Sequence, residues 1–140
     1  MNVEVNWWAV ILATASSMVV GSIWYARSVF GNMWMKLTKI DEKKMKEMSS
    51  AGPIVATIVA SLVTAYILAH VSFLAHKYFN NTFFVDAVST AFWVWLGFTA
   101  ARLVVHDAFE GRPVKLTVLN SAHELVTILV MGAIIGWMGV

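Results

Sequence analysis

The sequence contains no cysteine and few charged residues. The absence of cysteine excludes disulfides, thiolate metal sites and cysteine nucleophiles. Charged residues make up only 13% of the chain, whereas soluble domains carry about 25%. The formal charge of +2 is too small to indicate a nucleic-acid partner. The N-terminus also lacks the basic stretch of a cleaved signal peptide, so we expect the first apolar run to be retained.

Apolar residues take the place of the missing charges. Hydrophobic residues make up 59% of the sequence, and its mean hydropathy is +0.72. A soluble fold of 140 residues could not hide so much apolar surface, so the solvent must be a lipid bilayer. A spanning helix needs about 20 apolar residues, and backbone polar groups in hydrocarbon must be satisfied within the helix. The predicted fold is an all-α polytopic membrane protein, a single domain over residues 1–140 with transmembrane helices at about 5–26, 53–75, 85–108 and 114–138.

Basic residues predict the orientation of these helices. Nine of the ten Lys and Arg residues lie in the segment between the first two helices or around the turn between the last two. The loop between helices two and three holds only Lys77. Short cytoplasmic loops are enriched in Lys and Arg. We therefore expect both termini outside and the two basic segments in the cytoplasm.

The segment 32–50 is too polar to span a membrane. Met33, Leu37, Ile40 and Met48 fall on one helical side, and most basic residues fall opposite. This pattern predicts an interfacial amphipathic helix, with a break near Thr38. The alternative is a solvated loop with a short helix.

Small residues recur at four-residue spacing in the apolar stretches. The most distinct case is Gly132 and Gly136 in the fourth helix, a G-x-x-x-G pair. Such pairs allow close helix packing in lipid. The pair predicts a packing seam, either inside the bundle or between copies in a homo-oligomer.

Polar residues near the basic turn between the last two helices form the candidate site. Arg102, His106 and Glu110 share one helical stripe, and Gly111, Arg112 and Pro113 predict a tight hairpin. A charge deep in a membrane is costly, so Glu124 needs a partner, and Arg102 is the obvious one. The expected polar cluster consists of Arg102, His106, Asn120, His123 and Glu124. It is either a substrate, proton or ion site or a buried ion pair that locks the helices.

Other chemistries receive less support. Metal ligation would need convergent ligands, and no H-x-x-x-H or E-x-x-H pair is present, so no metal and no cofactor is expected. Ser121, His123 and Asp107 could form a hydrolase site only if they converged, but Ser121 and His123 point away from each other on a helix. His76 and Asp86 are expected to be solvated helix ends.

Several short motifs occur together in a familiar order. They are Asn6-Trp7, Gly21 to Tyr25, Phe30-Gly31 with Trp34, Trp95 to Phe98, Phe109 to Pro113, Asn120 with His123, and Met131 to Gly136. In this order the chain resembles the bacterial family called domain of unknown function 1761. The resemblance implies a small four-helix protein of the bacterial inner membrane and brings no activity or catalytic residue. On the expected topology, two groups of residues converge at the inner face, as either a site or a folding signature. One is the turn of Asn120–Glu124, and the other is an inner-face motif of Trp24, Tyr25, Trp34, Glu110, Gly111, Arg112 and Pro113.

The function predicted from these patterns is an oligomeric transporter, channel or small-molecule binding protein with its polar site near the inner leaflet. A structural or accessory membrane subunit, in which the polar cluster only locks the helices, is the alternative. The sequence gives no positive signal for an enzyme.

Overall fold

The structure is a computed structural model that describes residues 3–47 and 49–139. The described residues are almost entirely helical and contain no strand, which confirms the all-α prediction. In chain order the elements are α1 (Trp7–Trp24), the π-helical η1 (Arg27–Gly31), α2 (Asn32–Thr38), α3 (Glu42–Glu47), α4 (Ala51–Phe79), α5 (Phe83–Val94), the π-helical η2 (Trp95–Ala100), α6 (Ala101–Phe109) and α7 (Val114–Met138).

Four helices are long and apolar enough to cross a membrane. They are α1, α4, the continuous rod of α5, η2 and α6 over Phe83–Phe109, and α7. Their count is the one that the sequence predicts. The chain is therefore described as a membrane protein on the length and composition of its helices.

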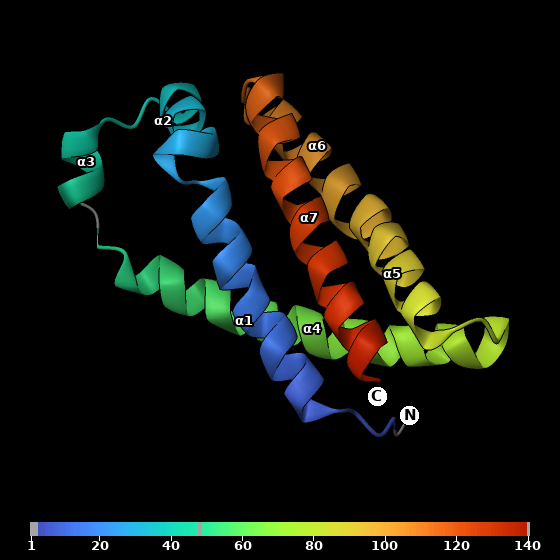
Figure 1. Ribbon diagram of the computed structural model, residues 1–140. Coiled ribbons are helices and arrows are strands. Elements are labelled where there is room, and N and C mark those ends of the chain that lie inside the picture. Colours follow the sequence, from blue (N-terminus) through green and yellow to red (C-terminus); the bar gives the residue numbers. More distant parts are fainter. Residues whose placement is uncertain (1–2, 48, 140) are drawn as a thin grey trace.

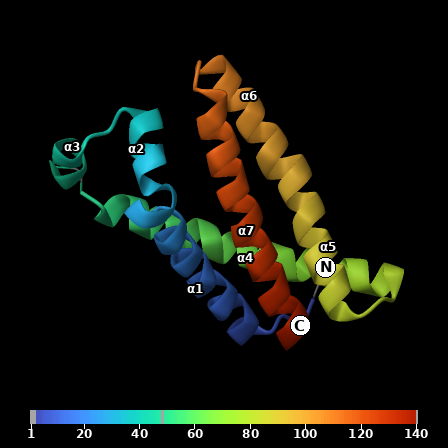
Figure 2. The same cartoon turned by 45° about the horizontal axis from the view of Figure 1, so that its top comes forward.

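Three of the helices run side by side, and the fourth crosses them. The α5–α6 rod and α7 form an antiparallel hairpin, and α1 packs along the other side of α7 (Figure 1). Helix α4 lies across this layer at a steep angle, which Figure 2 shows from a second direction. The two chain ends lie close together, where the Asn6 Nδ2 donates to the Met138 carbonyl over 3.3 Å.

Local signals explain where the helices begin and end. The Asn6 side chain caps α1 by accepting from the N–H groups of Trp8 and Ala9. Asn80 ends α4 in the left-handed conformation that a C-cap requires. Gly111, with φ +66, makes the tight turn between α6 and α7, as the Gly-Arg-Pro pattern predicts.

The core is built from small side chains that let the backbones approach closely. Gly132 and Gly136 of α7 are buried against α5. A Cβ on Gly132 would lie 2.9 Å from the Ala91 Cβ, and one on Gly136 would lie 2.8 Å from the Phe84 Cα. The predicted seam is thus an internal contact between α7 and α5, and the alternative reading as an interface between copies is wrong because this face is already filled.

The segment between α1 and α4 forms two short helices rather than one. Helix α2 ends at Thr38, where Lys39 is left-handed with φ 56, and α3 begins at Glu42. The break falls where the sequence predicts it. Leu37 and Ile40 are half-buried and Met33 is exposed, whereas Met48 lies outside the described residues.

The π-helical segment η2 changes which side of the third rod faces the bundle. In an uninterrupted α-helix, Arg102 would follow Ala91 by about three turns and share its buried face. A π turn adds a residue and rotates the chain after it by about 100°. Beyond η2 the inward positions are therefore Leu103, which is half-buried, and Asp107, which is 4% exposed. The Trp95 indole at the start of η2 donates to the Ser121 carbonyl over 2.9 Å and fastens this segment to α7.

Candidate binding groove

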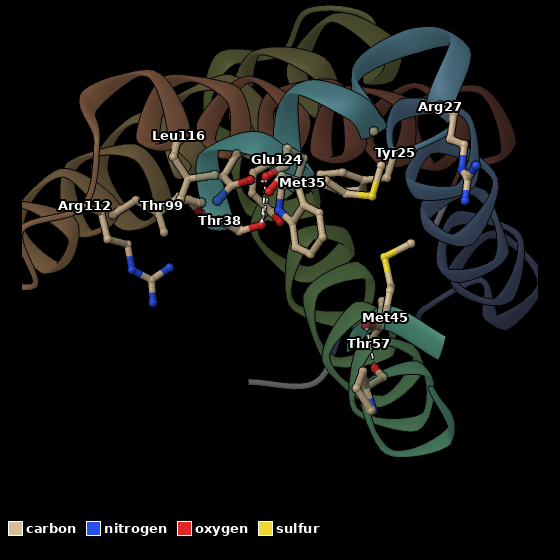
Figure 3. A pocket seen from close by; sticks show the side chains of 15 residues that line it. Tyr25, Arg27, Met35, Thr38, Met45, Thr57, Thr99, Arg112, Leu116 and Glu124 are labelled. Atoms are coloured by element: carbon tan, nitrogen blue, oxygen red, sulfur yellow. Dashed lines mark hydrogen bonds between the residues drawn. The ribbon is translucent and has the colours of Figure 1, made fainter. Parts of the chain in front are cut away.

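A groove of about 780 Å³ lies at the end of the bundle that carries the α6–α7 turn (Figure 3). Helices α2 and α3, the start of α4, and the facing parts of α6 and α7 supply its walls. Its lining residues are Tyr25, Arg27, Gly31, Trp34, Met35, Thr38, Met45, Pro53, Thr57, Thr99, Leu103, Arg112, Leu116, Asn120 and Glu124. The groove therefore gathers segments from five helices that are far apart in the sequence.

A hydrogen bond between α1 and α7 sets the polar part of the groove. The Tyr25 hydroxyl donates to the Asn120 Oδ1 over 3.1 Å. Burial raises the pKa of Tyr25, which follows the last residue of α1, to about 12, and the nearby charge of Glu124 adds to the rise. The phenol consequently stays protonated well above neutral pH and remains a donor to the Asn120 Oδ1.

Aromatic rings pack around the hydrogen bond between Tyr25 and Asn120. The His123 ring lies 5.0 Å from the Tyr25 ring and 6.0 Å from the Trp24 ring, and Trp34 of α2 contacts Tyr25 edge-on at 5.9 Å. The Trp24 Nε1 is buried and has no hydrogen-bond partner among the described residues. The rings hold the ends of α1, α2 and α7 together, so the predicted convergence of Trp24, Tyr25 and Trp34 with the α7 polar residues is present in the fold.

The turn after α1 depends on a glycine. Gly31 is buried in η1, and its N–H donates to the Ala26 carbonyl over 2.9 Å. A Cβ on Gly31 would collide with the Tyr25 carbonyl oxygen and approach the Ala26 carbonyl within 3.0 Å. The lack of a side chain here lets the chain fold back on itself and present both Tyr25 and α2 to the groove.

Glu124 is the carboxylate of the groove. Its side chain is 48% exposed and its Oε1 lies 3.4 Å from the His123 Nδ1. The His123 Nε2 in turn lies 3.4 Å from the Thr127 hydroxyl. Glu124 thus lines the groove with about half of its side chain exposed, so its carboxylate is accessible to a ligand.

Arg102 and His106 lie apart from this site. Both are exposed, and no salt bridge among the described residues joins Arg102 to Glu124. The stripe of Arg102, His106 and Glu110 exists, but the π turn directs it away from α7. The structure therefore brings together three of the five predicted cluster residues, Asn120, His123 and Glu124, and adds Tyr25 to them. Arg112 lines the same groove without contacting this cluster.

A second carboxylate at the groove end, Asp107, is buried and was not part of the predicted polar cluster. It accepts a hydrogen bond from the Thr117 hydroxyl over 2.7 Å at its Oδ2. The Arg112 Nε lies 3.7 Å from its Oδ1 and 2.6 Å from the Glu110 Oε2. This network closes the α6–α7 turn and holds Arg112 at the rim of the groove. Helical periodicity alone could not find Asp107, because its inward position depends on η2.

The opposite end of the bundle carries a second polar cluster. Asp86 is only 3% exposed; its carboxylate lies 3.0 Å from the His76 Nδ1 and accepts from the Asn81 Nδ2 over 2.9 Å. The expectation that Asp86 is solvated is therefore wrong, because α4 and α5 fold against each other directly beyond it. A cavity of about 480 Å³ lies beside this pair, and Asp86 is the charged residue among its lining side chains.

Comparison with known proteins identifies one family. Its fold and groove define an all-helical protein with four apolar, membrane-length helices. The family model described as "Protein of unknown function (DUF1761)" matches residues 8–136, so the chain belongs to this family. No curated protein and no solved structure matches it. Among the described residues, no group of three His, Asp or Glu side chains is placed to hold a metal ion.

Proposed function

We propose that this protein binds a small molecule in the groove, as a binding protein or transporter near the cytoplasmic leaflet of a bacterial inner membrane. The observation that carries the proposal is the groove of about 780 Å³ in which Tyr25, Asn120 and Glu124 meet. Small-molecule sites are typically concave spaces of about 300–1,000 Å³ with mostly apolar walls and a few oriented polar groups. The groove has all of these features.

Each polar residue has a role in this proposal. Glu124 binds or exchanges a proton with the ligand, because half of its surface is exposed toward the groove. Asn120 orients the ligand with the amide group that Tyr25 leaves free. His123, the neighbour of Glu124 on α7, lies against its carboxylate. Arg112, rather than Arg102, supplies the guanidinium that binds an anionic group of the ligand.

The proposed orientation follows from the distribution of basic residues. Both termini lie outside, and the basic segments around α2, α3 and the α6–α7 turn lie in the cytoplasm. The groove is then at the cytoplasmic side, and α2 and α3 rest at the inner interface. We also expect a homo-oligomer, formed through a face other than the one that holds Gly132 and Gly136.

A pair of matched variants tests the proposed site. Glu124→Gln removes the groove carboxylate, and Glu4→Gln makes the same change at an exposed position near the N-terminus. Native mass spectrometry of the purified protein in detergent would detect molecules retained from the host cells. We expect wild type and Glu4→Gln to retain a bound species that Glu124→Gln has lost, with unchanged helix content by circular dichroism. Identical spectra for all three proteins would contradict the proposal.

A structural role is the second candidate, and the contact between Tyr25 and Asn120 favours it. This bond and the surrounding rings fasten α1 to α7, as an accessory subunit without a ligand would also require. Under this alternative, Glu124→Gln unfolds the protein or changes nothing. A loss of the bound species without a loss of helix content distinguishes the two functions.

A further inference from the structure

The groove opens toward the side of the bundle. One wall is the start of α4, where Pro53 and Thr57 lie, and the other is formed by Thr99 and Leu103 of the third rod with Leu116 of α7. Residues 51–60 of α4 are all exposed, because this end of the helix extends past α1, beyond the other long helices (Figure 1). In Figure 3, Met45 and Thr57 lie well apart from Thr99 and Arg112.

Both walls belong to membrane-length helices. Thr57 lies within α4, and Thr99 lies within the rod of Phe83–Phe109. A mouth between two spanning helices faces hydrocarbon, so a molecule can enter from the bilayer without crossing water. Most of the lining is apolar, with side chains such as the half-buried Met35 and the exposed Met45. Such a surface suits an acyl chain, and methionine adapts to chains of different shape.

Charges of both signs line the same groove. Of the described residues that line it, Arg27, Arg112 and Glu124 are charged. Figure 3 places the two arginines toward opposite ends, with Glu124 between them. Each guanidinium is about half exposed. Arg27 lies 2.8 Å from Glu42, and the Nε of Arg112 lies 2.6 Å from Glu110 and 3.7 Å from Asp107. A guanidinium has five N–H donors, so both retain donors for a phosphate.

We infer that the occupant is a membrane phospholipid with a primary-ammonium headgroup of the phosphoethanolamine type, an inference that rests on the proposed function of the groove. The phosphate is bound by an arginine at the rim. The ammonium donates to the Glu124 carboxylate and lies beside the Asn120 amide. The acyl chains follow the apolar wall between α4 and the α6–α7 hairpin into the bilayer.

Headgroup chemistry makes this inference selective. A primary ammonium carries three N–H donors, as a lysine side chain does, and can bond directly to a carboxylate. A phosphocholine head carries the same charges but has no N–H donor. A phosphoglycerol head lacks the positive charge and leaves Glu124 facing an anionic ligand. The structure therefore favours phosphatidylethanolamine over both of the others.

The test uses nanodiscs that contain phosphatidylcholine with equal small amounts of phosphatidylethanolamine and phosphatidylglycerol. Lipid that stays bound to the released protein is measured by native mass spectrometry. Relative to the mole fraction of each lipid in the nanodisc, we expect wild type to retain phosphatidylethanolamine about tenfold over the other two lipids, the effect of one charge-assisted hydrogen bond on a half-exposed group. Glu124→Gln should remove this preference, and Glu4→Gln should keep it.

A blocked groove provides the second measurement. Because the chain has no cysteine, Thr57→Cys carries a single thiol at the groove wall, and a bulky maleimide attached to it fills the space. Blocking should abolish the lipid retention that the same Thr57→Cys protein shows before treatment. Maleimide treatment of wild type, which has no cysteine, should change nothing.

The outcomes separate this inference from the proposed function. If all three lipids are retained equally and blocking removes them, the groove binds lipid and the headgroup inference is wrong. A preference that survives Glu124→Gln contradicts it as well. If blocking Thr57→Cys changes no retained lipid, both the headgroup inference and a lipid-binding groove fall.

Discussion

The two ends of the bundle both hold carboxylates, but they use them differently. At one end Asp86 is buried, and His76 and Asn81 occupy both of its oxygens. At the other end Glu124 is half exposed in the groove, and among the described residues its one ion-pair partner is His123. The comparison indicates that a buried carboxylate whose oxygens are both occupied by residues of the chain stabilises the fold. A carboxylate with unused acceptor capacity toward a cavity is where a ligand can bind.

The close packing beside Asp86 should give the largest effect. Gly136→Leu places a side chain against the Phe84 backbone, where a single added Cβ would already be 2.8 Å from its Cα. We expect a loss of stability of about 3 kcal/mol, the upper part of the range for overpacking. Thermal unfolding in detergent, followed by circular dichroism, measures it.

Gly97→Leu is the matched control for that variant. A Cβ on Gly97 meets nothing within 4 Å, so we expect almost no change in the unfolding temperature. Equal effects at the two glycines would mean that α7 and α5 are not as close as the structure has them.

The second prediction compares the carboxylates directly. Asp86→Asn breaks the contact with His76 in a buried site and should cost about 2 kcal/mol of unfolding free energy. Glu124→Gln should cost less than about 0.5 kcal/mol, because Glu124 is half exposed. Urea or thermal unfolding of the two variants in the same detergent checks the difference. A larger loss for Glu124→Gln would reverse the assignment of the structural and ligand-binding ends.

A spectroscopic titration examines the groove end alone. Burial raises the pKa of Tyr25 to about 12, so one of the three tyrosines should ionise late when phenolate absorbance is followed with pH. Since the folded pKa lies above the ordinary value near 10, its contribution to stability is complete below pH 10 and is lost as the pH rises toward 12. Tyr25→Phe should remove the late transition. A normal titration of all three tyrosines would show that Tyr25 is not held in the cluster.

The smallest effect is expected at Arg102. Arg102→Gln should change stability by less than about 0.5 kcal/mol and leave lipid retention unaltered, because Arg102 is exposed outside the groove. The measurement is the same thermal unfolding and native mass spectrometry. A marked loss would restore the ion pair between Arg102 and Glu124 that helical periodicity suggests, and would place η2 in an α-helical register.

Much of the fold could be predicted because hydrocarbon leaves a chain few choices. The four apolar rods, the turn at Gly111 and the break near Thr38 follow from length, composition and turn chemistry. The convergence of Tyr25 with Asn120 and Glu124 follows from equal depth on neighbouring helices. What depends on how the helices pack did not follow, including the burial of Asp86 where α4 and α5 fold against each other.

The candidate site was only partly predictable for one physical reason. Assigning Arg102 and His106 to the α7 face assumes an unbroken 3.6-residue period. The π turn at Trp95–Ala100 violates that assumption and brings Asp107 inward instead. No residue type in this segment predicts a π turn. The bond from the Trp95 indole to the Ser121 carbonyl, which fastens the segment to α7, is visible only in the folded structure.

The length of α4 has a consequence for the membrane around the protein. Its 29 residues rise about 1.5 Å each, roughly 44 Å in all, whereas the hydrocarbon layer is about 30 Å thick. A helix longer than the hydrocarbon layer is accommodated by tilting, and α4 crosses the other three rods steeply in Figures 1 and 2. A thicker bilayer favours a more upright α4, which would swing its free first half toward the hairpin. Lipid thickness would thereby set how wide the side opening stands.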